Sequence, residues 1–251
     1  MAGDNDSPAL YKSAFTFNHG ALVCRGPDMT CYFAFPSSDA LRDSSLTLLE
    51  NFERGAREPQ NTLFIRVAQL FADEVVDMLL LNLVRGSETP HSSASVIESF
   101  AGLIKTTVHG LIKQLLSKMS NDEMRPLSTV IAERRLTLTQ DGTEKDYICF
   151  IMPPDFYARF KSVLEQGIKG ERHSDELLAC METFSEMAHE AFYEESIRPL
   201  KLGFIGRKLT DVGGAAMRKG ATSANRRLVP GLAGQELIDF CTYFHGFMLE
   251  A

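Results

Sequence analysis

Several signatures that would assign a reaction are missing from this chain of 251 residues. It contains no G-x-S-x-G, no P-loop, no H-E-x-x-H and no G-x-G-x-x-G. These patterns mark α/β-hydrolases, P-loop nucleotide enzymes, zinc proteases and dinucleotide-binding folds, so none of these classes has support. These absences favour a protein that is not an enzyme without deciding the question, and the sequence leaves any cofactor unidentified.

Cysteine is sparse, and its pattern excludes two kinds of small fold. The five cysteines are widely spaced and contain no C-x-x-C pair, which argues against a zinc ribbon and against a disulfide framework. We expect reduced, mostly buried thiols. A bridge between Cys24 and Cys31 is the alternative, and it requires an oxidising compartment that nothing else in the sequence indicates.

No segment reads as an export signal or a membrane span. Residues 1–10 begin with an acidic, polar run and are expected to be disordered. The most apolar stretch, from Val67 to Val84, is interrupted by Asp73, Glu74 and Asp77, which favours a buried helix. A cytoplasmic protein is the simplest interpretation.

Excess positive charge is also lacking. The formal net charge is -7 and the sequence pI is about 5.4, which argues against a surface built as a whole for nucleic acid. The apolar fraction of 44% and the charged fraction of 24% are ordinary for globular proteins. A local basic patch stays compatible with these values.

A short pattern occurs twice: a strand pair, a proline, and then a helix. The first copy pairs residues 22–24 with 31–33 and continues through Pro36. The second copy forms a hairpin around Asp141-Gly142 and continues through Pro153. The offset between the copies drifts from about 117 to about 113 residues and aligns Phe71 with Phe184.

Apolar spacing of three and four residues predicts most of the chain to be helical. The helices are expected at about 39–54, 61–85, 93–119, 121–134, 156–166, 174–197 and 236–249. The expected N-caps are Ser37-Ser38-Asp39 for the helix 39–54, Asn61 for 61–85 and Asp155 for 156–166. The predicted fold class is α+β, mainly α, with two hairpins. The repeat suggests two pseudo-symmetric ββααα halves around one core, covering residues 11–120 and 121–251, either as two units or as one continuous domain.

The segment 201–227 is basic inside an acidic protein. Its cations are Lys201, Arg207, Lys208, Arg218, Lys219, Arg226 and Arg227. They could bind a small anionic ligand, a protein partner or nucleic acid. Alternatively, an antiparallel return would place them against the acids of the helix 174–197. Gly213-Gly214 and Gly220 disfavour a helix here. For the glycine pair, a close crossing of two helices is favoured, and a phosphate-binding loop is the less favoured alternative.

Two further features could carry chemistry or assembly. Glu186 and His189 form an E-x-x-H pair, the spacing used by di-iron sites in four-helix bundles, but no second copy exists and the solvated face of a helix is the favoured interpretation. The C-terminal aromatics Phe240, Phe244 and Phe247 share one helix face. They are expected to pack on the protein's own core, with a homodimer interface as the alternative.

The sequence thus favours a non-enzymatic regulatory or adaptor protein that binds a protein partner or a small anionic ligand through segment 201–227. A metal- or cofactor-dependent enzyme using the Glu186/His189 face and a nucleic-acid-binding regulator are the alternatives.

Overall fold

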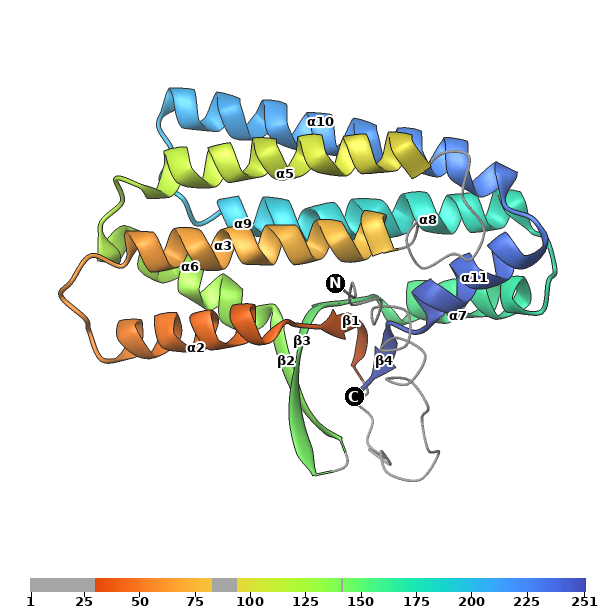
Figure 1. Ribbon diagram of the computed structural model, residues 1–251, viewed down its shortest axis with the longest axis horizontal. Helices are drawn as coiled ribbons and strands as arrows, with labels where there is room; N and C mark the ends of the chain where they lie inside the picture. The colour runs from red at the N-terminus through yellow and green to blue at the C-terminus, as the bar shows by residue number, and fades with distance from the viewer. Residues whose placement is uncertain (1–29, 83–93, 141) are drawn as a thin grey trace, which may run out of the picture.

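Helices and one small antiparallel sheet make up the computed structural model, which describes residues 30–82, 94–140 and 142–251 (Figure 1). The sheet has four strands, β1 (Cys31–Pro36), β2 (Arg135–Gln140), β3 (Thr143–Ile151) and β4 (Met248–Glu250). This architecture confirms the predicted α+β, mainly α, fold class. Residues 1–10, which were expected to be disordered, lie outside the described residues.

The sheet is assembled from distant parts of the chain in the order β2-β3-β1-β4. The β2–β3 hairpin is confirmed, and Gly142 supplies the positive φ of 75° that its turn requires. β1 pairs antiparallel with β3 on one side and with β4 on the other. The expected first partner of β1, residues 22–24, lies outside the described residues.

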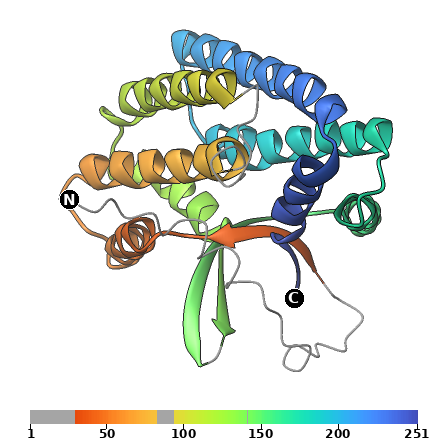
Figure 2. The same cartoon turned by 45° about the vertical axis from the view of Figure 1, so that its right-hand side comes forward.

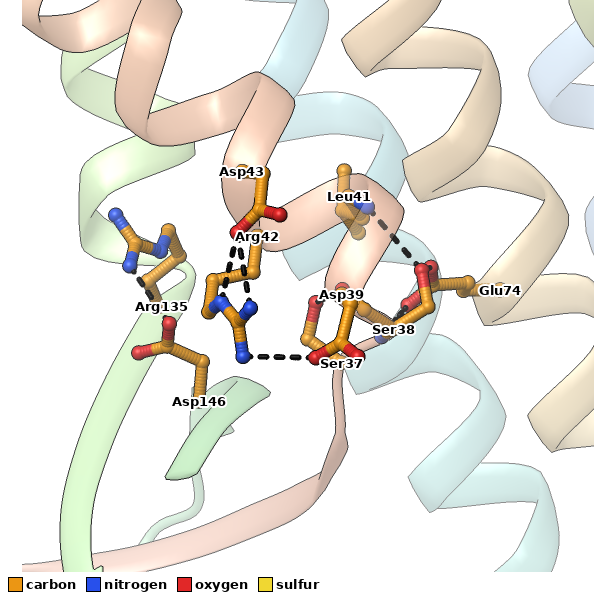
Figure 3. Close-up of polar contacts among 9 residues, drawn as sticks. All are labelled: Ser37, Ser38, Asp39, Leu41, Arg42, Asp43, Glu74, Arg135 and Asp146. Carbon is orange, nitrogen blue, oxygen red and sulfur yellow. Dashed lines mark hydrogen bonds and ion pairs between the residues drawn. The ribbon is translucent and has the colours of Figure 1, made fainter. Parts of the chain in front are cut away.

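The first helix, α2 (Asp39–Glu53), leaves the sheet through a polar junction. The Ser38 hydroxyl accepts the backbone N–H of Leu41 at 3.1 Å, as an N-cap does (Figure 3). Ser38 in turn donates its backbone N–H to Glu74 at 3.2 Å and its hydroxyl to the same carboxylate. Burial raises the pKa of Glu74, and the two Ser38 hydrogen bonds oppose that shift. The junction therefore ties the start of α2 to the last turn of the next helix, α3 (Asn61–Val76).

α3 (Asn61–Val76) continues without a break into the π-helical turn η1 (Asp77–Leu81), and α5 (Ala94–Leu116) packs against both. The expected cap was wrong, because Gln60 is the N-cap residue and makes no side-chain cap bond. The Asn61 amide instead donates to the carbonyls of Leu116 at 2.8 Å and Met119 at 2.6 Å. Asn61 thus fastens the beginning of α3 to the end of α5.

The middle of the chain follows the predicted order. α6 (Asn121–Glu133) begins with a capping box between Ser120 and Glu123. α7 (Pro154–Ile168) starts earlier than expected, because Pro153 is the N-cap residue and Asp155 lies in the first turn. α8 (Ser174–His189) runs through a second π-helical turn, η2 (Glu190–Glu194), into α9 (Glu195–Ile197).

The basic segment is one continuous helix, α10 (Phe204–Leu228), so the expectation that its glycines weaken the helix was wrong. A 3-10 turn, η3 (Val229–Gly231), leads to α11 (Gly234–His245). The final helix was expected to reach Leu249, but it ends at His245 because the chain then enters the sheet as β4. Pairing with β1 satisfies the backbone of residues 248–250 there.

The helices stack in layers above the sheet. α2 and α7 flank it, α3 and α8 lie above them, and α5 and α10 form the outermost layer (Figure 2). Phenylalanines dominate the core, and the rings of Phe33 and Phe184 lie 4.6 Å apart. Phe240, Phe244 and Phe247 are buried in this core, which confirms that they pack on the protein itself. Cys31, Cys149, Cys180 and Cys241 are free and buried, as expected, and Cys24 lies outside the described residues.

Three pairs of corresponding elements in the two halves have equal lengths. α2 and α7 have 15 residues each, α3 and α8 have 16, and η1 and η2 have 5. Asn61 and Ser174 begin the two 16-residue helices, 113 positions apart. Phe33 faces Phe150 in the antiparallel β1–β3 register, close to the offset read from the sequence. These coincidences favour duplication and pseudo-symmetry, which stay predictions, as does the division at residue 120.

Within the described ranges, no helix is both long and apolar enough to cross a membrane.

Candidate functional site

A cavity of about 300 Å³ lies inside the helical layers. Its walls come from α3, η1 and α5 on one side and from α6, α8, η2 and α10 on the other. The lining is mostly apolar, with Phe71, Val75, Val108, Leu111 and Phe192 among its side chains. This volume is at the lower end of the range that small-molecule pockets occupy. The cavity is therefore the leading candidate binding site among the described residues.

Polar side chains gather where the wall of the cavity passes from α8 and η2 to α10. The Arg218 guanidinium donates from Nε to Nδ1 of His189 at 3.1 Å and from a terminal nitrogen to Glu194 at 2.6 Å. Tyr193 donates its hydroxyl to the carbonyl of Thr210 at 2.7 Å. We call His189, Tyr193, Glu194 and Arg218 the polar cluster. Its members except Glu194 line the cavity.

His189 is held in its neutral form inside this cluster. Its side chain is only 7% exposed. Burial is the main cause that lowers its pKa, and Arg218 lowers it further, while Glu194, Glu186 and the Gly214 backbone act in the opposite sense. Nδ1 accepts the Arg218 N–H, so the ring proton lies on Nε2, which is buried without a hydrogen-bond partner among the described residues. The site therefore contains a buried donor beside a charged guanidinium.

Tyr193 is equally constrained. Burial raises its pKa to about 12, with Glu194 and Asp211 adding to the shift, so the phenol stays protonated near neutral pH. Two α10 glycines make room for the ring: a Cβ on Gly214 would lie 2.9 Å from Tyr193 Cε1, and one on Gly213 would lie 3.0 Å from the hydroxyl. This close crossing is the arrangement that the sequence favoured for the Gly213-Gly214 pair.

The basic segment divides into paired and unpaired cations. Arg218 contacts Glu194, and Arg226 contacts Glu182 at 2.7 Å. These two arginines of α10 therefore pair with acids of the segment 174–197, as the antiparallel alternative predicted. Arg207 donates to the carbonyl of Leu202. The remaining predicted site residues are exposed and, within the described chain, lie farther than 4 Å from any carboxylate: Lys201, Lys208, Lys219 and Arg227.

The E-x-x-H pair does not lie on a solvated face as a unit. Glu186 is exposed, but His189 is buried, so that interpretation was wrong for the histidine. Glu186 comes within 3.8 Å of Arg218 and not toward a second carboxylate. Over the described ranges, no group of three or more His, Cys, Asp or Glu side chains is placed to hold a metal ion.

One further cation lines the cavity, and no sequence pattern singled it out. Arg134 at the end of α6 donates to the carbonyl of Ala191 at 3.1 Å and forms an ion pair with Glu195. Burial lowers its pKa. Tyr193 and Glu194 were also missed as candidates, because they follow His189 on a stretch that reads as an ordinary amphipathic helix. Both lie in the π-helical turn η2 and contact residues of α10.

No known protein helps to assign the site. Comparison with models of protein families, with curated proteins and with solved structures finds no match.

Proposed function

We propose that the protein is a non-enzymatic binding protein whose ligand is a small amphipathic molecule. The apolar body of the ligand occupies the cavity between the helical layers, and a hydrogen-bonding head group reaches the polar cluster. The cavity carries this proposal, because a partly enclosed apolar volume with a few polar groups at one edge is the usual form of a small-molecule site. An apolar cavity stays dry and favours apolar occupants.

The polar cluster supports the choice of head group. His189 Nε2 is a buried donor that makes no hydrogen bond of ordinary geometry among the described residues and has only a weak interaction with the Gly214 backbone. A ligand acceptor that met this donor after a small side-chain shift would recover free energy. Both cations on the wall already contact a carboxylate, Arg218 with Glu194 and Arg134 with Glu195. A ligand therefore needs an acceptor and at most a single negative charge. This revises the small anionic ligand expected from the sequence by moving it from the surface of 201–227 into the interior.

Thermal unfolding with three compounds tests the proposal. Decanol and decanoate share a chain and differ in the head group, whereas inorganic phosphate has charge without a chain. A ligand that binds only the folded state stabilises it by about 2.7 kcal/mol at 100 times its Kd. For a chain of this size that corresponds to a rise in Tm of roughly 5 to 10 °C. We expect such a rise with one or both of the ten-carbon compounds and none with phosphate.

Two alanines of α10 provide the matched variants. Ala221 lines the cavity and Ala215 is exposed on the same helix. Ala221→Leu should abolish most of the ligand-induced shift by filling the cavity, and Ala215→Leu should leave it unchanged. The proposal is wrong if neither ten-carbon compound raises Tm, if phosphate raises it equally, or if both variants respond like the unaltered protein. The regulatory or adaptor role stays a prediction.

A further inference from the structure

The outer face of α10 carries alternating basic and apolar side chains. Positions 204, 208, 212, 215 and 219 are spaced by three and four residues, so they follow one another along one side of the helix. They are occupied by Phe204, Lys208, Val212, Ala215 and Lys219, all exposed, which we call the outer stripe. Phe204 is 83% exposed and Val212 63%. α10 belongs to the outermost layer of helices (Figure 2), and the exposure of these five residues places the stripe on its solvent side.

The neighbouring helix extends this surface. α5 runs antiparallel to α10, because Gly206 faces Leu115 while Gly220 faces Phe100. Leu103 of α5 is 64% exposed. Over the described lengths of α5 and α10, exposed acids occur only at Glu98 and Asp211, although the whole protein is acidic. The outermost layer thus has a sign of charge opposite to that of the chain.

We infer that the outer stripe docks on an anionic lipid surface. Isolated Phe and Val side chains between lysines suit a bilayer interface, where apolar groups enter the acyl boundary and lysine ammonium groups stay among the phosphates. Each Lys near an anionic leaflet contributes about a fivefold gain in partitioning. Lys208 and Lys219 are free of carboxylate partners within the described chain, so their charge is available.

Other occupants fit the stripe less well. A stable protein interface needs roughly 1,000 Å² of complementary surface, whereas the large apolar side chains here are isolated. Single-stranded nucleic acid requires aromatic stacking platforms, and the stripe has one phenylalanine. A fluid lipid surface demands neither shape complementarity nor stacking. The inference does not depend on a ligand in the cavity.

Vesicle co-sedimentation of the full chain tests the inference. We expect binding to vesicles of phosphatidylglycerol and phosphatidylcholine at low salt, with little binding to pure phosphatidylcholine and a marked loss at high salt. Lys208→Gln combined with Lys219→Gln should weaken binding roughly 25-fold, at about fivefold per lysine. Phe204→Ser and Val212→Ser should each weaken it by a smaller factor.

Matched controls carry the same substitutions elsewhere. Lys145→Gln with Lys169→Gln removes two exposed lysines from β3 and the end of α7, and Ile151→Ser removes a side chain 62% exposed, close to the exposure of Val212. These variants and Ala221→Leu should bind vesicles like the unaltered protein. The inference fails if the stripe variants, shown to be folded by their melting curves, bind equally well, if pure phosphatidylcholine suffices, or if no vesicle binds. It also fails if the stripe instead mediates binding to duplex DNA or self-association.

Discussion

Two places in the fold that the predicted pseudo-symmetry would relate are built from opposite kinds of side chain. Where η1 meets α5, a small apolar cluster is formed by Val76, Leu80, Leu81, Ala101 and Ile104. A shift of 113 residues, the spacing of the two 16-residue helices, leads to the place where η2 meets α10. The residues found there are His189, Tyr193, Glu194, Gly214 and Met217. The same frame is therefore apolar in one half and polar in the other.

One ion pair is present in both places. Lys105 Nζ lies 3.7 Å from Asp73, and Arg218 Nε lies 3.8 Å from Glu186, again 113 positions further on. The frame thus keeps a cation from the outer helix over the inner helix in each half. In the apolar half, packing and this ion pair suffice to hold α5 against α3 without a polar cluster. By analogy, the polar cluster is not required to hold α10 against α8. We interpret the polar cluster as the part adapted to binding.

The largest effect should come from placing the first-half alanine into the second half. Gly214→Ala matches Ala101, but its Cβ would lie 2.9 Å from Tyr193, whose hydroxyl is held by Thr210. Overpacking costs about 1 to 3 kcal/mol, and the gain in helix propensity returns up to about 1 kcal/mol. We expect a net loss of about 1 to 2 kcal/mol in the free energy of unfolding, measured by urea denaturation.

Gly102→Ala on α5 is the matched control, since nothing lies within 4 Å of its added Cβ. That variant should be stabilised by up to about 1 kcal/mol. Adding Tyr193→Leu to Gly214→Ala recreates the first-half pair of Leu80 and Ala101 and should recover most of the loss. A Gly214→Ala protein as stable as the unaltered chain, or a double variant without recovery, would contradict the equivalence.

An intermediate effect is expected from removing the two equivalent cations. Arg218→Met breaks the bonds to His189 and Glu194, and Lys105→Met breaks those to Asp77 and Asp73. Partly exposed pairs of this kind contribute on the order of 1 kcal/mol, so both variants should lose a similar amount of stability. Only Arg218→Met should also change the decanol- or decanoate-induced rise in Tm. Equal ligand responses in the two variants would remove the functional distinction between the halves.

The helical frame could be read from the sequence because it depends on local periodicity. Most helix positions, the β2–β3 hairpin and the inward C-terminal aromatics followed from apolar spacing and turn residues. The expectations that failed were decided by distant partners. β4 forms where it can pair with the edge of β1. In α10, Tyr193 packs against Gly213 and Gly214 and Phe100 packs against Gly220, and this packing compensates for the low helix propensity of glycine.

The candidate site was less accessible to sequence reasoning. Arg218 and His189 were singled out, but for surface charge and metal binding, since nothing in a one-dimensional pattern places them on the same cavity wall. The cavity itself is a volume left between five or more helices, and no residue spacing encodes it. The π-helical turns could not be predicted either. Their backbone hydrogen bonds join residues five apart instead of four, and no difference in amino-acid composition accompanies this change.

The smallest and most specific effect should appear in the pH dependence of His189→Val, which installs the residue equivalent to Val76. The pKa of His189 is lowered in the folded protein by burial and Arg218, so folding favours the neutral ring. Its contribution to stability is therefore complete above the unfolded pKa of about 6.5 and is lost as the pH falls toward the folded pKa. The free energy of unfolding of the unaltered protein should decline over that interval more steeply than that of His189→Val, as measured by urea denaturation between about pH 5 and pH 8. Because Arg218 is one cause of the lowered pKa, the His189 ring in Arg218→Met should titrate at higher pH by NMR.

Parallel stability curves for the unaltered protein and His189→Val would mean that His189 is not buried as a neutral donor. The polar cluster would then lose the group that distinguishes it from its apolar counterpart.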